Sequence, residues 1–152
     1  MQLDELYSLY LQHPSIQTDT RKLQKGDLFF ALKGPHFNGN LFAKQALDLG
    51  AAYVIADEVQ GPGDQRIIIT DDVLTTLQQL AGYHRRRFNI PFIAITGSNG
   101  KTTTKELVHA VLSSTYKTYT TKGNLNNHIG IPLTILGINP DAEMAVIEMG
   151  AN

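Results

Sequence analysis

One segment of the chain, residues 93–104, constrains the fold more than any other. It reads Ile-Ala-Ile-Thr-Gly-Ser-Asn-Gly-Lys-Thr-Thr-Thr, an apolar run that enters a Gly-containing turn and then a helix with Lys101 and Thr102 at its start. Backbone N–H groups of such a turn and of the following helix point toward phosphate oxygens. The lysine ammonium then meets the β- and γ-phosphates, and the threonine hydroxyl can bind Mg²⁺. The segment therefore predicts a nucleotide triphosphate site between a strand and a helix.

This motif is a shortened form of the general phosphate-binding loop. The general pattern has a glycine five residues before the Gly-Lys pair, and Ile95 stands there in this chain, so the motif reads Gly-x-x-Gly-Lys-Thr-Thr. A chance Gly-Lys-Thr in an ordinary loop is the alternative, but the flanking strand and helix patterns favour the phosphate site. The residues predicted to cradle the phosphates are Gly97, Ser98, Asn99, Gly100, Lys101, Thr102 and Thr103.

The composition is that of a soluble globular chain with one or two small domains. Its 152 residues carry a net charge of −1, which argues against a broad nucleic-acid surface. No stretch is long and apolar enough to span a membrane, and the N-terminus, with Asp4 and Glu5, lacks the basic and apolar regions of a signal peptide. The absence of cysteine excludes disulfides and thiolate zinc sites. We therefore expect a cytoplasmic protein with neither a nucleic-acid nor a membrane partner.

Apolar patterns alternate between strands and helices along the chain, which predicts parallel sheets covered by helices. We expect an α/β fold: a small N-terminal α/β domain over residues 1–88, and the start of a parallel-sheet P-loop domain over residues 89–152. Asp71 or Asp72 can cap the third helix. The apolar positions of the predicted helices lie within residues 3–11, 42–47, 73–80 and 107–112, and the last of these helices starts at the phosphate loop. The predicted strands cover 28–32, 53–56, 67–69, 91–95, 117–120 and 144–148.

Glu148 ends the last predicted strand. Ligands of open parallel sheets bind at the carboxyl ends of the strands, so Glu148 and the phosphate loop should share one edge. Mg²⁺ prefers oxygen ligands, and Glu148 can complete its shell together with Thr102. The alternative is a solvent-facing glutamate at a strand end.

A segment rich in Gly and Asn, residues 120–132, lies between the phosphate loop and Glu148 in the sequence. Its composition predicts a loop that hydrogen-bonds ligands.

Several segments resemble the Mur ligases of peptidoglycan synthesis. In the second half these are the phosphate loop with its three threonines, residues 123–127 leading to 130–134, and the end at 148–152. In the first half, residues 19–22, 26–34 and 46–52 resemble the uridine-nucleotide domain of the family. The resemblance spans nearly the whole chain and is strongest to the branch that adds D-Ala-D-Ala to UDP-MurNAc-tripeptide. The motifs of the first half are shared with the MurE branch.

The resemblance implies a three-domain enzyme with separate domains for the UDP-sugar, for ATP and for the incoming amino acid or dipeptide. Residues 1–88 would be the UDP-sugar domain and residues 89–152 the first part of the ATP domain. The implied reaction is ATP-dependent amide synthesis, in which UDP-MurNAc-tripeptide forms an acyl phosphate that D-Ala-D-Ala then attacks. We expect the full-length enzyme to be a monomer, and this chain to be a fragment that does not catalyse ligation alone.

The resemblance also implies roles for individual residues of the second half. Lys101 would be the catalytic residue that stabilises the β- and γ-phosphates of ATP. Thr102 and Glu148 would hold Mg²⁺. Asn124 and Asn127 would position nucleotide or substrate groups.

In the first half, Asp19-Thr20-Arg21 falls on the Asp-Ser-Arg pattern of the family. Thr20 and Arg21 are therefore expected to contact the UDP moiety. Threonine stands here for the family's serine and keeps the hydroxyl group. An ordinary capped turn is the alternative.

Two further interpretations belong to other classes. One is another ligase of the superfamily, of the MurE or folylpolyglutamate synthetase type. The other is a nucleotide-binding module without catalysis. Binding of a UDP-sugar separates the Mur ligases from a general phosphate-loop protein, and dependence on the peptide stem separates the two Mur branches.

Overall fold

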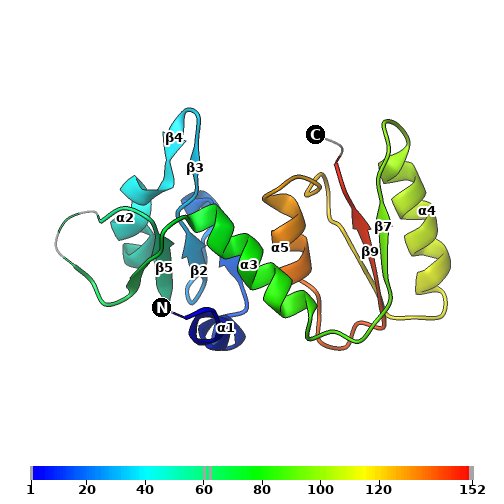
Figure 1. The fold of residues 1–152 in the computed structure, drawn as a ribbon, viewed down its shortest axis with the longest axis horizontal. Coiled ribbons are helices and arrows are strands. Elements are labelled where there is room, and N and C mark those ends of the chain that lie inside the picture. The colour runs from blue at the N-terminus through cyan, green and yellow to red at the C-terminus, as the bar shows by residue number, and fades with distance from the viewer. Residues whose placement is uncertain (1, 60, 62, 151–152) are drawn as a thin grey trace. The chain divides into compact units, whose positions relative to one another are not determined.

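The computed structural model describes residues 2–59, 61 and 63–150. The chain divides into two compact units, Met1–Leu80 and Ala81–Asn152 (Figure 1). The division falls inside helix α3, Val73–Arg85. The boundary that we expect from the sequence, 88/89, follows the end of this helix, and the assignment of each half to a ligand stays a prediction.

The first unit contains a four-stranded parallel sheet. Its strands are β1 (Ile16–Gln17), β2 (Leu28–Phe30), β5 (Tyr53–Ala56) and β6 (Ile67–Ile69), in the order β1-β2-β5-β6. The predictions for β5 and β6 are confirmed in full, and β2 is shorter than its apolar run. The very short β1 has no apolar run of its own and was not predicted.

Three helices accompany this sheet, and all three confirm sequence predictions. They are α1 (Leu3–Gln12), α2 (Ala43–Asp48) and α3. Helix α2 packs against β5, with Ala46 and Val54 in one buried apolar cluster. Asp72 rather than Asp71 caps α3, because its Oδ1 accepts a hydrogen bond of 2.7 Å from the Thr75 N–H.

A hairpin that the sequence did not predict follows β2. Its strands β3 (Lys33–Gly34) and β4 (Phe37–Asn38) are antiparallel, and a 3₁₀ turn, η2 (Gly39–Phe42), leads on to α2. Asn40 within this turn is fully buried. Its side chain donates to Asp57 Oδ1 at 2.8 Å and accepts from the Asp57 N–H at 3.1 Å, so the hairpin is tied to the chain just after β5.

The second unit contains a three-stranded parallel sheet in the order β7-β9-β8. Its strands are β7 (Phe92–Ile95), β8 (Thr118–Thr120) and β9 (Met144–Glu148), close to the predicted ranges. Ile95 lies beside Glu148 in the register of β7 and β9. The phosphate loop begins directly after Ile95, so the loop and Glu148 share the carboxyl edge of the sheet, as we expect from the sequence.

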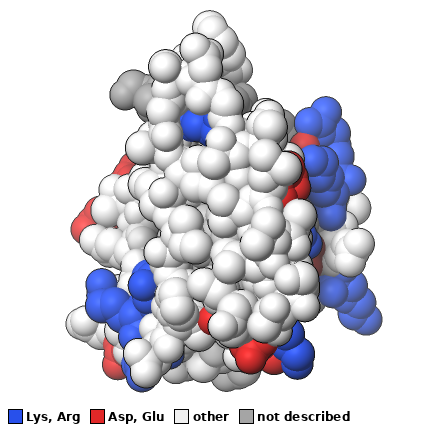
Figure 2. Space-filling view, turned by 90° about the vertical axis from the view of Figure 1, so that its right-hand side faces the viewer, with Lys and Arg blue, Asp and Glu red and all other residues white. Residues whose placement is uncertain are grey.

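Helix α4 (Lys101–Ser113) packs against all three strands of this sheet. The predicted helix is confirmed, but its apolar residues divide between two sides. Leu107 is 64% exposed and Val111 is 71% exposed, whereas Val108 and Leu112 are half-buried. The side of the molecule where α4 lies in Figure 1 presents few charged side chains over most of its centre (Figure 2).

Helix α5 (Gly130–Leu136) lies where the sequence composition predicted only a loop. Asn127 Oδ1 accepts hydrogen bonds from the N–H groups of Ile129 and Gly130, at 3.1 and 2.8 Å, and so stabilises the start of this helix. Gly130 is required for packing, because a Cβ there would lie 2.4 Å from the backbone carbon of Leu125. The loop prediction was therefore wrong for residues 130–132.

Candidate functional site

The phosphate loop connects β7 to α4 through two glycines with positive φ. Gly97 has φ of +147°, and Gly100, which precedes the first turn of α4, has φ of +74°. The left-handed conformation at Gly100 is costly for residues with a Cβ, so the loop depends on glycine there. The first N–H groups of a helix have no partner within the helix and carry a partial positive charge. The loop therefore provides a site for an anion at the start of α4.

Lys101 directs its ammonium group back over this loop. Its Nζ donates a hydrogen bond of 2.7 Å to the carbonyl oxygen of Gly97, and the residue is half-buried. The ammonium therefore lies above the turn whose N–H groups would hold phosphates. The role predicted for Lys101, neutralising the charge of the β- and γ-phosphates, stays a prediction.

Glu148 is the most unusual residue of the edge, because its carboxylate is buried and only partly satisfied. The residue is 1% exposed. Its Oε1 accepts hydrogen bonds from Thr102 Oγ1 at 3.2 Å and from Asn126 Nδ2 at 2.7 Å. Its Oε2 is buried and has no hydrogen-bond partner among the described residues. A buried acceptor without a partner is destabilising, and a bound cation would remove that cost.

Thr102 and Glu148 therefore fit a hard divalent cation. Both offer oxygen atoms, they lie in contact, and one carboxylate oxygen has no other described partner. Mg²⁺ takes one or two protein oxygens and completes its shell with water and phosphate oxygens. The structure brings together three residues predicted for this site, namely Lys101, Thr102 and Glu148.

The asparagine-rich loop contributes a residue that the sequence did not single out. Asn126 binds Glu148, and its carbonyl oxygen accepts a hydrogen bond from the Gly150 N–H. Asn127 accepts hydrogen bonds from the backbone at the start of α5, while Asn124 is exposed. The roles predicted for Asn124 and Asn127 toward a ligand stay predictions. Three asparagines within four positions indicate in the sequence that this loop forms hydrogen bonds. Only the fold shows which of the three contacts Glu148.

A cavity of about 480 Å³ lies in the first unit beside the predicted UDP contacts. Thr20 and Arg21 belong to a 3₁₀ turn, η1 (Thr20–Lys22), that Asp19 caps by accepting from the Arg21 N–H at 3.0 Å. Hydrogen bonds from Arg21 also lower the pKa of Asp19 to about 2. The capped turn that was the alternative interpretation is present, and it also faces the cavity. The lining residues are Thr18, Asp19, Thr20, Arg21, Phe29, Phe37, Gly39, Phe42 and Gln45.

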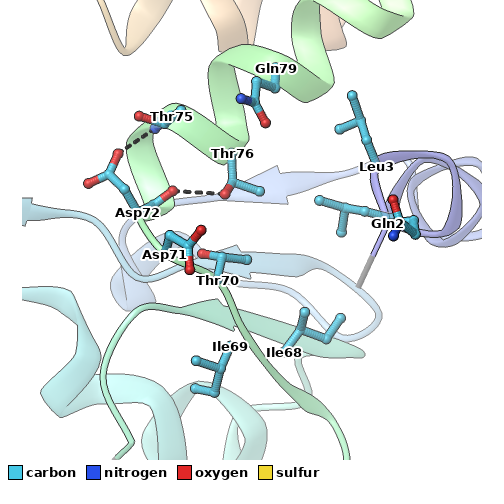
Figure 3. A pocket seen from close by; sticks show the side chains of 11 residues that line it. Gln2, Leu3, Ile68, Ile69, Thr70, Asp71, Asp72, Thr75, Thr76 and Gln79 are labelled. Atoms are coloured by element: carbon cyan, nitrogen blue, oxygen red, sulfur yellow. Dashed lines mark hydrogen bonds between the residues drawn. The ribbon is translucent and has the colours of Figure 1, made fainter.

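A second cavity of about 290 Å³ lies between the end of β6 and the starts of α1 and α3 (Figure 3). Asp72 lines it, but its polar atoms are engaged within α3. Its carboxylate accepts from the Thr75 N–H, and its carbonyl oxygen accepts from Thr76 Oγ1 at 2.8 Å. This cavity contains no residue predicted for a site, and of its two carboxylates, Asp71 and Asp72, that of Asp72 is used to cap the helix.

The described part of the chain contains no helix long and apolar enough to cross a membrane.

Comparison with known protein families decides the relationship of the chain. The profile described as "Mur ligase family, catalytic domain" matches residues 14–85, and the profile described as "Mur ligase middle domain" matches residues 95–152. The chain belongs to the Mur ligase family. The two matches are separated by residues 86–94, which follow α3, and one match falls mainly in each unit.

Curated relatives and solved structures agree with this assignment. The chain is 47% identical over 137 residues to a UDP-N-acetylmuramoyl-tripeptide–D-alanyl-D-alanine ligase of Bacillus subtilis, covering 89% of this chain and 30% of that protein. It is 40% identical over 148 residues to the ligase of the same name from Escherichia coli, covering 97% of this chain and 32% of that protein. The chain thus spans about a third of the length of these Mur ligases.

The fold matches solved Mur ligases as well. A crystal structure of MurF from Acinetobacter baumannii superposes with a TM-score of 0.82 at 38% identity, covering 90% of this chain and 30% of that one. MurF from Thermotoga maritima, solved in complex with ADP, gives a TM-score of 0.84 at 34% identity, covering 93% of this chain and 33% of that one. A diaminopimelate-adding ligase, at 22% identity and a TM-score of 0.56, shares the fold alone.

Proposed function

We propose that this chain supplies the UDP-sugar and ATP-phosphate sites of an ATP-dependent ligase that joins D-Ala-D-Ala to UDP-MurNAc-tripeptide. The observation that supports it most is the convergence of Lys101, Thr102 and a buried, half-satisfied Glu148 at one sheet edge. Identities of 40–47% to ligases of that name support the choice of substrates.

The residues of the phosphate site have different roles. The loop N–H groups and the start of α4 hold the phosphates, and Lys101 neutralises charge on the transferring γ-phosphoryl group. Thr102 and Glu148 would hold Mg²⁺, which would supply neutralisation of the phosphate charge. Asn126 holds Glu148 Oε1 in place, while Oε2 has no described hydrogen-bond partner and would be available to a cation.

The first unit would hold the UDP moiety in its cavity. Phe37 and Phe42 are 55% and 43% exposed and provide apolar ring surface at the cavity wall. Arg21 supplies a guanidinium group that remains 86% exposed although it pairs with Asp19. An exposed arginine of fixed orientation suits a diphosphate, and Thr20 adds a hydroxyl group beside it.

The reaction has two steps. A carboxylate oxygen of the tripeptide attacks the γ-phosphorus of ATP, the bond to the β-phosphate oxygen breaks, and ADP leaves. The amine of D-Ala-D-Ala then attacks the acyl phosphate carbonyl, and phosphate leaves as the amide forms. Neither step needs a nucleophilic side chain, so positioning and charge neutralisation are what this chain must provide.

Calorimetric titration of the chain tests the proposal. We expect binding of Mg·ATP and of UDP-MurNAc-tripeptide, with UDP-MurNAc-dipeptide binding more weakly. Lys101→Ala should weaken Mg·ATP binding and leave the UDP-sugar affinity unchanged, because the two sites lie in different units. Lys117→Ala is the matched control, since Lys117 is an exposed lysine paired with Asp141 in the same unit.

Each outcome bears on a separate part of the proposal. Equal affinity for tripeptide and dipeptide would favour a MurE-type ligase. Absence of UDP-sugar binding with intact Mg·ATP binding would favour a nucleotide-binding module. Unchanged Mg·ATP affinity in Lys101→Ala would refute the assignment of Lys101.

A further inference from the structure

A second lysine lies one helical turn after Lys101, and it faces the protein rather than the loop. Lys105 is 1% exposed, although lysine is seldom fully buried unless it is paired. Its Nζ donates a hydrogen bond of 2.8 Å to the carbonyl oxygen of Thr121 and lies 2.8 Å from Glu106 Oε1. Burial of an ammonium group is costly, so a leucine or methionine would serve better if only packing mattered here.

Thr121 connects this buried lysine to the candidate metal ligand. It follows the last residue of β8 and is 1% exposed. Its carbonyl oxygen accepts from Lys105, while its hydroxyl oxygen accepts from the Glu148 N–H at 2.9 Å. Its own N–H donates to the Val146 carbonyl at 3.2 Å. All three polar backbone and side-chain groups of Thr121 are thus used between α4 and β9.

We propose that Lys105 is a positioning residue that holds the Glu148 carboxylate in place through Thr121, and thereby sets the affinity of the site for Mg²⁺. The inference rests on the proposed function, because it assumes that Glu148 binds the cation. Lys105 touches neither phosphate nor metal in this arrangement. It fixes the backbone at the start of the loop that also carries Asn126, the other anchor of Glu148.

Loss of Lys105 would disturb both residues that hold Glu148, namely Thr121 and Asn126. Without the ammonium, the Thr121 carbonyl loses a buried donor, and the chain from Thr121 to Asn126 becomes free to shift. The hydrogen bonds that Thr121 accepts from the Glu148 N–H and that Asn126 donates to Glu148 Oε1 would then no longer fix the orientation of Glu148. Residues that orient metal ligands commonly change metal affinity by about 10- to 100-fold when they are replaced.

Two substitutions test the connection at different points. Lys105→Met keeps the length of the side chain and removes the donor. Thr121→Val keeps the carbonyl that Lys105 binds and removes only the hydroxyl that holds Glu148. Lys117→Met is the control, because it makes the same chemical change at an exposed lysine.

The measurement is a titration of Mg²⁺ at fixed ATP, followed by calorimetry, with ATP affinity in EDTA and thermal unfolding recorded for each variant. We expect Lys105→Met and Thr121→Val to raise the half-saturating Mg²⁺ concentration about tenfold. Their ATP affinity in EDTA should match that of the original chain, since Lys101 and the loop are unchanged.

The outcomes separate this inference from the proposed function. No Mg²⁺-dependent ATP binding by the original chain would refute the proposed function itself. Normal Mg²⁺ dependence in folded Lys105→Met and Thr121→Val variants, with lowered stability alone, would show that Lys105 only anchors α4 and would overturn the inference. If Lys105→Met does not fold, Thr121→Val decides the question.

Discussion

Replacement of Glu148 by glutamine should make the chain more stable in the absence of Mg²⁺. Glu148 is 1% exposed, and its Oε2 has no hydrogen-bond partner among the described residues. Glutamine has the same shape, and its amide oxygen can still accept from Thr102 and Asn126. The substitution therefore removes a buried charge while it keeps both hydrogen bonds.

The size of the change in stability depends on the replacement of the Glu148 Oε2 oxygen by a neutral Nε2 amide group. An unsatisfied buried polar group costs about 1–3 kcal/mol, and a charged group costs more. Glu148→Gln leaves a neutral Nε2 without a described partner at the same place, so part of the cost remains. We expect a net gain of about 1–2 kcal/mol, which corresponds to a rise in Tm of roughly 5–10 °C for a unit of this size.

The assay is thermal unfolding of the original chain and of Glu148→Gln, with EDTA and with Mg·ATP. A ligand that binds only the folded state stabilises it by RT ln(1 + [L]/Kd), so the gain grows with the ratio of ligand concentration to Kd. Mg·ATP should therefore raise the Tm of the original chain more than that of Glu148→Gln, which keeps Lys101 and the loop but lacks the carboxylate for the cation. Glu143→Gln is the control, because Glu143 is an exposed glutamate just before β9.

Two results would refute the reasoning. A lower Tm for Glu148→Gln in EDTA, with Glu143→Gln unchanged, would show that the carboxylate is satisfied without a metal. A full Mg·ATP response in Glu148→Gln would show that Glu148 does not bind the cation.

Three other perturbations test the fold around the two sites. Gly130→Ala should destabilise the chain by about 1–3 kcal/mol in urea unfolding, because its Cβ would lie 2.4 Å from the Leu125 backbone; full stability would contradict the packing. Asp72→Ala should cost about 1 kcal/mol by loss of the Thr75 cap, and Asp72→Asn should restore most of it. Burial lowers the pKa of His84 below its ordinary 6.5, so its contribution to stability is complete above that pH and falls as the pH drops through it, because the unfolded state takes up the proton first. Urea titrations from pH 8 to pH 5 should show this loss, and His84→Phe should reduce it.

Local sequence patterns determined the elements that carry the phosphate site. Strand β7 is an apolar run, β9 is apolar up to Glu148, and the loop between β7 and α4 has glycine where the backbone takes positive φ. These are short-range signals, because they depend on side-chain periodicity and backbone conformation within a few residues. The expectation that Glu148 lies beside the phosphate loop followed from the parallel order of strands alone.

In the asparagine-rich loop, local sequence patterns do not predict the contacts of individual residues. Asn124, Asn126 and Asn127 are chemically identical, and their composition predicts only a polar loop. Asn126 binds Glu148, while Asn127 hydrogen-bonds the backbone at the start of α5. Helix α5 itself begins at a glycine that packs against Leu125, and glycine at the start of a helix gives no local signal of helix.

Lys105 shows the same limit for a charged residue. Its spacing from Lys101 indicates one helix face, and lysine predicts exposure. Only the approach of α4 to the end of β8 makes it buried and gives its ammonium the Thr121 carbonyl. The amino-acid sequence by itself determined the longer strands and the glycine-containing loop, and it predicted the kind of ligand. The tertiary structure decided which polar groups meet, because those contacts join residues far apart in the chain whose pairing depends on how the helices and strands pack.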